Sequence, residues 1–115
     1  MKIETPDGLT MQGSVTIPDV ITYKMFRAFY KAYNEKLPES EDNTMWGQKW
    51  RAAVALLGGW GTVDIEGLPH GEFTASGDSV PLDVYCWVGG AVDAHLGELL
   101  AFGNVKKNVL KRWTG

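Results

Sequence analysis

The first clear pattern in the chain is an alternation of apolar and polar residues over positions 11–17, the period of a half-buried strand. Residues 3–4 form a shorter arm. The TPDG run at residues 5–8 is typical of a turn, because Pro presets its own φ and Gly tolerates positive φ. Pro18 ends the ladder, since it has no N–H to donate. The pattern predicts a β-hairpin within residues 3–17.

A helical period follows, from Thr22 to about Lys36. Thr22 is a suitable N-cap, and Leu37-Pro38 provides a stop because Pro disfavours helical geometry in the residue before it. Lys24, Arg27 and Lys31 share the polar side. The apolar face comprises Met25, Phe26, Phe29, Tyr30 and Tyr33.

After an acidic linker at residues 39–43, a second helix is predicted to run to Leu57, with its N-cap at one of residues 42–44. Gly58-Gly59 should end it, with Gly58 in the left-handed geometry that commonly closes a helix. We interpret Trp46 and Trp50 as part of a core face rather than an exposed recognition patch. This face comprises Trp46, Trp50, Ala53, Val54 and Leu57, with Lys49 and Arg51 turned away.

The remaining pattern predicts a short strand at residues 60–65, a loop over residues 67–79 and a long helix. Pro81 lies in the first turn of this helix, where its missing N–H is harmless, and Gly103-Asn104 should end it after Phe102. Gly89-Gly90 costs about 1 kcal/mol per residue in a helix interior, which suggests close approach of another backbone, or a bend. The apolar stripe comprises Val84, Val88, Ala91, Val92, Leu96, Leu99 and Phe102.

The chain has 115 residues, of which 44% are hydrophobic and 22% charged, so it can bury one core. We therefore expect an α+β fold, mainly helical, in which an N-terminal β-hairpin packs on about three helices. Residues 1–104 should form a single domain, and residues 105–115 a basic C-terminal tail.

Charge divides the chain at the same place. Residues 1–104 carry seven basic and fourteen acidic side chains, a net charge of −7, whereas residues 105–115 carry four basic side chains and no acid. Binding of the tail to nucleic acid is disfavoured because the acidic body would repel a polyanion. Two alternatives stay open: a solvated tail, or a segment that docks on an acidic protein surface.

Membrane and secretory roles are not expected. The longest apolar run, residues 52–57, is far shorter than the roughly 18 residues that span a bilayer, and the N-terminus has no apolar signal segment. We expect a cytoplasmic protein.

Chemistry-bearing residues are sparse, so no catalytic residues, cofactor or metal site are predicted and the protein is not expected to be an enzyme. Cys86 and His95 lie nine residues apart, on opposite faces of the predicted helix, which disfavours a nucleophile–base pair. Cys86 is expected to be a small buried hydrophobe, and His95 to form a surface pair with Glu98. The carboxylates of residues 64 and 66 are interpreted as solvated edge charges. Gly58–Gly61 lacks the Lys-Ser/Thr of a phosphate loop.

Four features in order resemble a group of small tail assembly proteins of long-tailed bacteriophages, over most of residues 15–104. They are the run IPDVIT at residues 17–22 before an aromatic helix, the Trp46 helix, Trp60 with VDIEGLP at residues 63–69, and VPL at residues 80–82 opening VYCW at residues 84–87.

The resemblance implies a non-enzymatic tail assembly chaperone, in the host cell cytoplasm, which coats the aggregation-prone tape measure protein and helps to recruit tail tube protein. A small domain could cover an apolar helix by helix-in-groove packing. No nucleic-acid or membrane partner is expected, and a homo-oligomer is left open. The candidate protein-binding residues are Trp87, Val105, Val109, Leu110 and Trp113.

Two alternatives belong to other classes. The protein could be a structural part of the virion, such as a tail completion or connector protein, or it could bind a host enzyme or defence protein. For Trp87, a place in the core is the alternative to a binding role.

Overall fold

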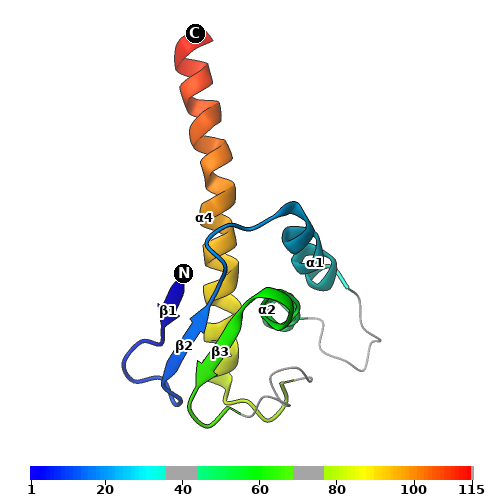
Figure 1. Ribbon diagram of the computed structural model, residues 1–115, viewed down its shortest axis with the longest axis vertical. Coiled ribbons are helices and arrows are strands. Elements are labelled where there is room, and N and C mark those ends of the chain that lie inside the picture. The colour runs from blue at the N-terminus through cyan, green and yellow to red at the C-terminus, as the bar shows by residue number, and fades with distance from the viewer. Residues whose placement is uncertain (36–43, 69–76, 115) are drawn as a thin grey trace.

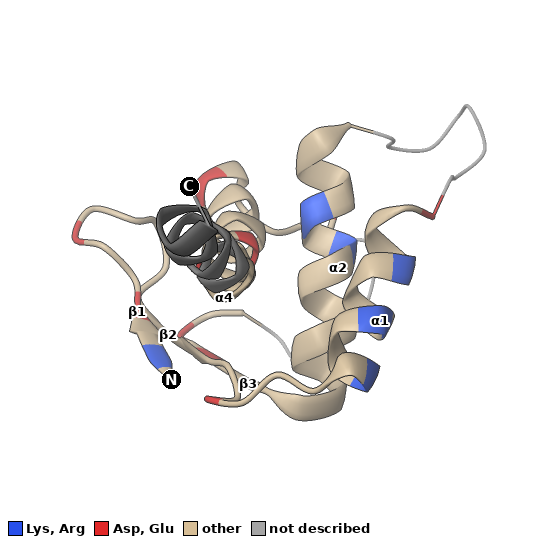
Figure 2. Ribbon diagram, turned by 90° about the horizontal axis from the view of Figure 1, so that it is seen from above, with Lys and Arg blue, Asp and Glu red and all other residues tan. Residues whose placement is uncertain are grey.

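The computed structural model describes residues 1–35, 44–68 and 77–114, with side chains described up to residue 100 (Figure 1). The predicted α+β, mainly helical fold is confirmed, and in these described residues it comprises a small antiparallel sheet and three helices. Helix α4 (Leu82–Thr114) packs on α2 (Met45–Trp60), and α2 in turn packs on α1 (Tyr23–Tyr33). Viewed along α4, α2 lies between α4 and α1 (Figure 2). The acidic linker at residues 39–43 and the proposed stop at Leu37-Pro38 lie outside the described residues.

The sheet contains the predicted hairpin and one further strand. Strand β1 (Lys2–Glu4) pairs with β2 (Gly13–Thr16), and β2 pairs on its other side with β3 (Thr62–Ile65). Ile3, Val15 and Val63 lie opposite one another in this register, so they share the face that contributes Val15 to the core. The strand predicted near residues 60–65 is confirmed, although its pairing with the hairpin was not predicted.

Helix α1 begins as predicted. The Thr22 hydroxyl accepts a hydrogen bond from the backbone N–H of Met25, at 3.3 Å, which satisfies one of the free donors of the first turn. Met25 and Phe29 are buried. The helix ends at Tyr33, where Asn34 donates from its backbone and its side chain to the carbonyl of Tyr30.

Helix α2 is capped by Thr44, one of the three residues considered, whose hydroxyl accepts from the Gly47 N–H at 3.1 Å. The predicted stop at Gly58-Gly59 is wrong, because the helix runs through both glycines to Trp60. Gly61 ends it instead. Its N–H donates to the carbonyl of Leu57, and a Cβ at this position would lie 2.6 Å from the carbonyl oxygen of Thr16. The end of α2 is therefore set by the approach of the chain to β2.

Helix α4 also extends further than predicted. Gly103-Asn104 does not end it, since the helix continues to Thr114 and includes the segment expected to be a tail. Elongation of an existing helix is far easier than nucleation, so two weak helix formers need not stop it. Pro81 directly precedes the helix and its carbonyl accepts from the Tyr85 N–H. In Figure 1 the later half of α4 stands away from the rest of the molecule.

The core lies where α2 meets α4 and the sheet. Trp50 is 1% exposed and stacks on Tyr85, with ring centroids 4.6 Å apart. Gly89 permits this packing: a Cβ there would lie 3.1 Å from the backbone of Lys49, so the predicted close approach of a second backbone is confirmed. The buried hydrophobic residues are Val15, Ile17, Met25, Phe29, Trp50, Ala52, Ala53, Leu56, Leu57, Ile65, Val80, Val84, Val88, Val92 and Leu96.

Three side chains lie in other surroundings than expected. Trp46 is 43% exposed, so the two tryptophans of the predicted core face are divided between surface and core. Cys86 is half-buried. The expected surface pair of His95 with Glu98 is wrong, because His95 is buried while Glu98 is exposed, and neither ring nitrogen of His95 has a hydrogen-bond partner among the described residues. His95 lies on the side of α4 that packs inward.

Candidate helix-binding groove

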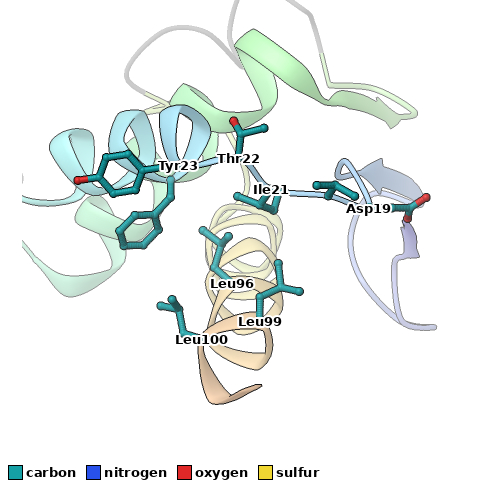
Figure 3. A pocket seen from close by; sticks show the side chains of 9 residues that line it. Asp19, Ile21, Thr22, Tyr23, Leu96, Leu99 and Leu100 are labelled. Atoms are coloured by element: carbon teal, nitrogen blue, oxygen red, sulfur yellow. The ribbon is translucent and has the colours of Figure 1, made fainter. Parts of the chain in front are cut away.

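An apolar groove opens where α4 leaves the body of the protein, beside the beginning of α1. Both helices pack on α2 and diverge from it, which leaves a surface hollow of about 620 Å³ between them. Figure 3 shows its two sides. The hollow is lined by Asp19, Val20, Ile21, Thr22, Tyr23, Phe26, Leu96, Leu99 and Leu100.

One side of the groove is the segment that joins the sheet to α1. Ile17 is fully buried at the end of β2 and the Thr22 cap fixes the start of α1, so the residues between them are held at both ends. Val20 and Tyr23 are nevertheless 76% and 73% exposed. These two large apolar side chains are thus presented to solvent on a well-anchored backbone.

The other side is a leucine cluster on α4. Leu96 is buried, whereas Leu99 and Leu100 are 42% and 59% exposed. In Figure 3 the three leucines project from α4 toward the segment that carries Ile21 and Thr22. Two consecutive leucines cannot both lie on the narrow stripe that faces the core, because neighbours on a helix differ by about 100° in direction.

A second hollow, of about 240 Å³, continues the groove along α1. It shares Phe26, Leu96 and Leu100 with the first hollow. Its remaining lining residues are Phe29, Tyr30, Tyr33, Asp93 and Gly97. Phe26 stacks on Tyr30 with centroids 5.7 Å apart, and Phe29 on Tyr33 at 6.2 Å. The two hollows therefore form one apolar surface, divided where Phe26 faces the leucines.

Within the described part of the chain, the charged side chains that line the two hollows are both acidic, Asp19 and Asp93. The N-terminal ammonium of Met1 donates to Asp19 Oδ1 at 2.7 Å, and this hydrogen bond, with the accompanying charge attraction, lowers the pKa of Asp19. Asp93 pairs with Lys49 at 3.6 Å. The groove is thus apolar along its length, with one carboxylate in each hollow.

The candidate residues from the sequence lie apart from this groove or outside the described side chains. Trp87 is half-buried and packs against the core. Val105, Val109, Leu110 and Trp113 lie in the extended half of α4. Val20, Tyr23 and Leu100, which line the groove, were not among the binding residues predicted from the sequence. The adjacent pair Leu99-Leu100 was the signal that could have revealed an apolar surface wider than the core stripe.

The residues that the structure describes include no group of three or more His, Cys, Asp or Glu side chains that could hold a metal ion. The carboxylates interpreted as solvated edge charges are both exposed: Asp64 lies in the edge strand β3 and Glu66 directly follows it. Among the same residues, no helix is both long and apolar enough to cross a membrane.

Comparison of the chain with protein-family models, with curated proteins and with solved structures gave no match.

Proposed function

We propose that this protein works by binding, without catalysis, and that the groove between α1 and α4 holds an amphipathic helix of another protein. The observation that carries this proposal is the clustering of exposed apolar side chains. Half of the large hydrophobic residues that the described structure leaves exposed lie on this one surface, which is unusual unless a partner covers it. They are Val20, Tyr23, Tyr30, Leu99 and Leu100.

The shape of the groove suits a helix better than an extended strand. One wall is α4 and the other is α1 with the segment that leads into it, and a third helix can pack against both helices at the usual interaxial distance of about 8–10 Å. The hollows on either side of Phe26 would receive two apolar side chains on one face of the ligand helix. Burial of each such side chain stabilises the complex by about 1.5–3 kcal/mol before the costs of association are subtracted.

The resemblance to small tail assembly proteins suggests which helix this is. We propose that the protein is a phage tail assembly chaperone and that the groove covers an apolar stripe of the tape measure protein in the host cell cytoplasm. Masking such a stripe would keep a long helical chain soluble until tail tube protein assembles around it.

Co-expression with the tape measure protein of the same phage tests this proposal. The wild-type chain should keep the tape measure soluble, and Val20→Asp, which puts a charge into the groove, should weaken binding at least tenfold. Leu82→Asp is the matched control, because Leu82 is 77% exposed and lies outside the groove. Equal binding by the two variants would contradict the proposed site.

Mass spectrometry of purified virions separates the chaperone from a structural role. A chaperone leaves during assembly, so it should be absent or present only in traces. Stoichiometric amounts in mature particles would favour a tail completion or connector protein instead.

A further inference from the structure

The second half of α4, residues 105–114, is basic and carries apolar residues, which suits an apolar groove on an acidic protein. Residues 105–115 carry Lys106, Lys107, Lys111 and Arg112 with no acid, whereas residues 1–104 have a net charge of −7. Asp19 and Asp93 in the groove already pair with the Met1 ammonium and with Lys49, so the attraction comes from the net charge of the body as a whole, which favours approach of a basic segment. The basic residues of α1, Lys24, Arg27 and Lys31, line neither hollow.

This segment cannot reach the groove of its own chain while α4 is a continuous helix. The groove lining on α4 ends at Leu100, and each further residue moves the helix about 1.5 Å away, so residue 110 lies about 15 Å beyond it. Figure 1 shows this half of α4 directed away from the sheet, α1 and α2. Docking must therefore occur between two molecules.

We infer that a second copy of this chain occupies the groove, and that two copies exchange the 105–114 halves of their α4 helices. The inference rests on the proposed function in so far as the groove must accept a helix. In such a symmetric pair each copy supplies one groove and one helix, which makes a closed dimer rather than an open chain. The two α4 ends would run antiparallel, side by side.

The apolar positions of α4 are consistent with this arrangement. Leu99 and Leu100 line the groove and are followed in the same helix by the exchanged segment. The contact between the two copies would therefore be continuous from the groove to the exchanged segment. Positions 105, 109 and 113 are Val, Val and Trp, and their four-residue spacing places them along one side of the helix. The exchanged dimer is the resting state, and a partner helix must displace the segment to bind.

Sedimentation equilibrium of the full chain at low salt tests the exchange. The wild type should be a dimer, and deletion of residues 105–115 and the groove variant Val20→Asp should each raise the dimer dissociation constant at least tenfold. The deletion variant keeps an intact groove, and the Val20→Asp variant keeps an intact helix. An equimolar mixture of the two should therefore form a complex in which the groove of the first binds the helix of the second. Leu82→Asp should remain dimeric.

Charge reversal and salt dependence test the inference further. The charge reversals Lys106→Glu and Lys111→Glu together should weaken the dimer, as should added salt. A monomeric wild type, a deletion variant that still dimerises, or a Val20→Asp dimer as tight as wild type would overturn the exchange. Binding of the tape measure helix to the deletion variant is measured separately. If the helix binds but the wild type is not a dimer, only the exchange is contradicted. If the wild type is a dimer but the helix does not bind, only the proposed function is contradicted.

Discussion

The two halves of α4 share one helical backbone and have opposite surroundings. From Val84 to Leu96 the helix packs inward, with Val84, Val88 and Val92 fully buried. From Gly97 to Leu100 every residue is exposed, and the helix then continues to Thr114 away from the body. Because elongation of a formed helix is easier than nucleation, the packed half can support a second half that stands away from the body.

The largest expected effect is on the packed half. Trp50→Ala should lower the free energy of unfolding by about 3–5 kcal/mol, because it removes a ring that is 1% exposed and stacked on Tyr85 of α4. Trp46→Ala is the matched control on the same helix and should cost less than about 1 kcal/mol, since Trp46 is 43% exposed. Urea denaturation measures both values. Equal decreases in the free energy of unfolding for the two variants would contradict the placement of Trp50 in the core and Trp46 at the surface.

A smaller effect is expected where α2 and α4 meet. Gly89→Val should cost about 1–3 kcal/mol, because even the Cβ would lie 3.1 Å from the backbone of Lys49. Gly90 faces open space, so Gly90→Ala should stabilise the helix by about 0.5–1 kcal/mol. Thermal unfolding of the two variants gives the comparison, and destabilisation by Gly90→Ala would argue against the described packing.

In the exposed half the same kind of substitution should affect binding rather than stability. Leu100→Gln keeps a good helix former at a position that is 59% exposed, so the free energy of unfolding should change by less than about 0.5 kcal/mol. Binding of the partner helix should nevertheless weaken several-fold. Calorimetry of binding and urea denaturation of the same sample check the two halves of this prediction, and a large loss of stability would place Leu100 in the core.

The smallest effect concerns the start of the packed half. Asp83 accepts hydrogen bonds from the hydroxyl of Thr10 at 2.7 Å and from the backbone N–H of Thr10 at 2.8 Å. The bond from the hydroxyl, and to a smaller extent the bond from the N–H, lowers the pKa of the Asp83 carboxyl. Its folded pKa is thus below its unfolded one, so its contribution is present above the unfolded pKa and is lost as the pH falls through the folded pKa. Asp83→Asn should be slightly less stable than wild type at pH 7, and the difference should be lost as the pH falls through the folded pKa of Asp83. A difference that is independent of pH would exclude the carboxylate as its source.

Much of the local structure could be predicted, because it depends on hydrogen bonds between near neighbours. The Thr22 and Thr44 caps satisfy donors only three residues away, and the hairpin turn joins adjacent strands. The predicted ends of α2 and α4 were wrong because they depend on residues far apart in the chain. Glycine weakens a helix but does not by itself end it. Helix α2 ends where Gly61 approaches the carbonyl oxygen of Thr16 in β2.

The candidate groove illustrates what residue order alone leaves open. Helical spacing correctly predicted that α1 and α4 each have an apolar face, yet it could not tell which side chains the fold would cover. His95 is buried and Leu100 is exposed, although polarity alone suggests the reverse. Periodicity measures how apolar residues are arranged within one element. Contacts between residues far apart in the chain decide which apolar side chains are buried and which stay exposed between α1 and α4. These contacts form only when both helices pack on α2.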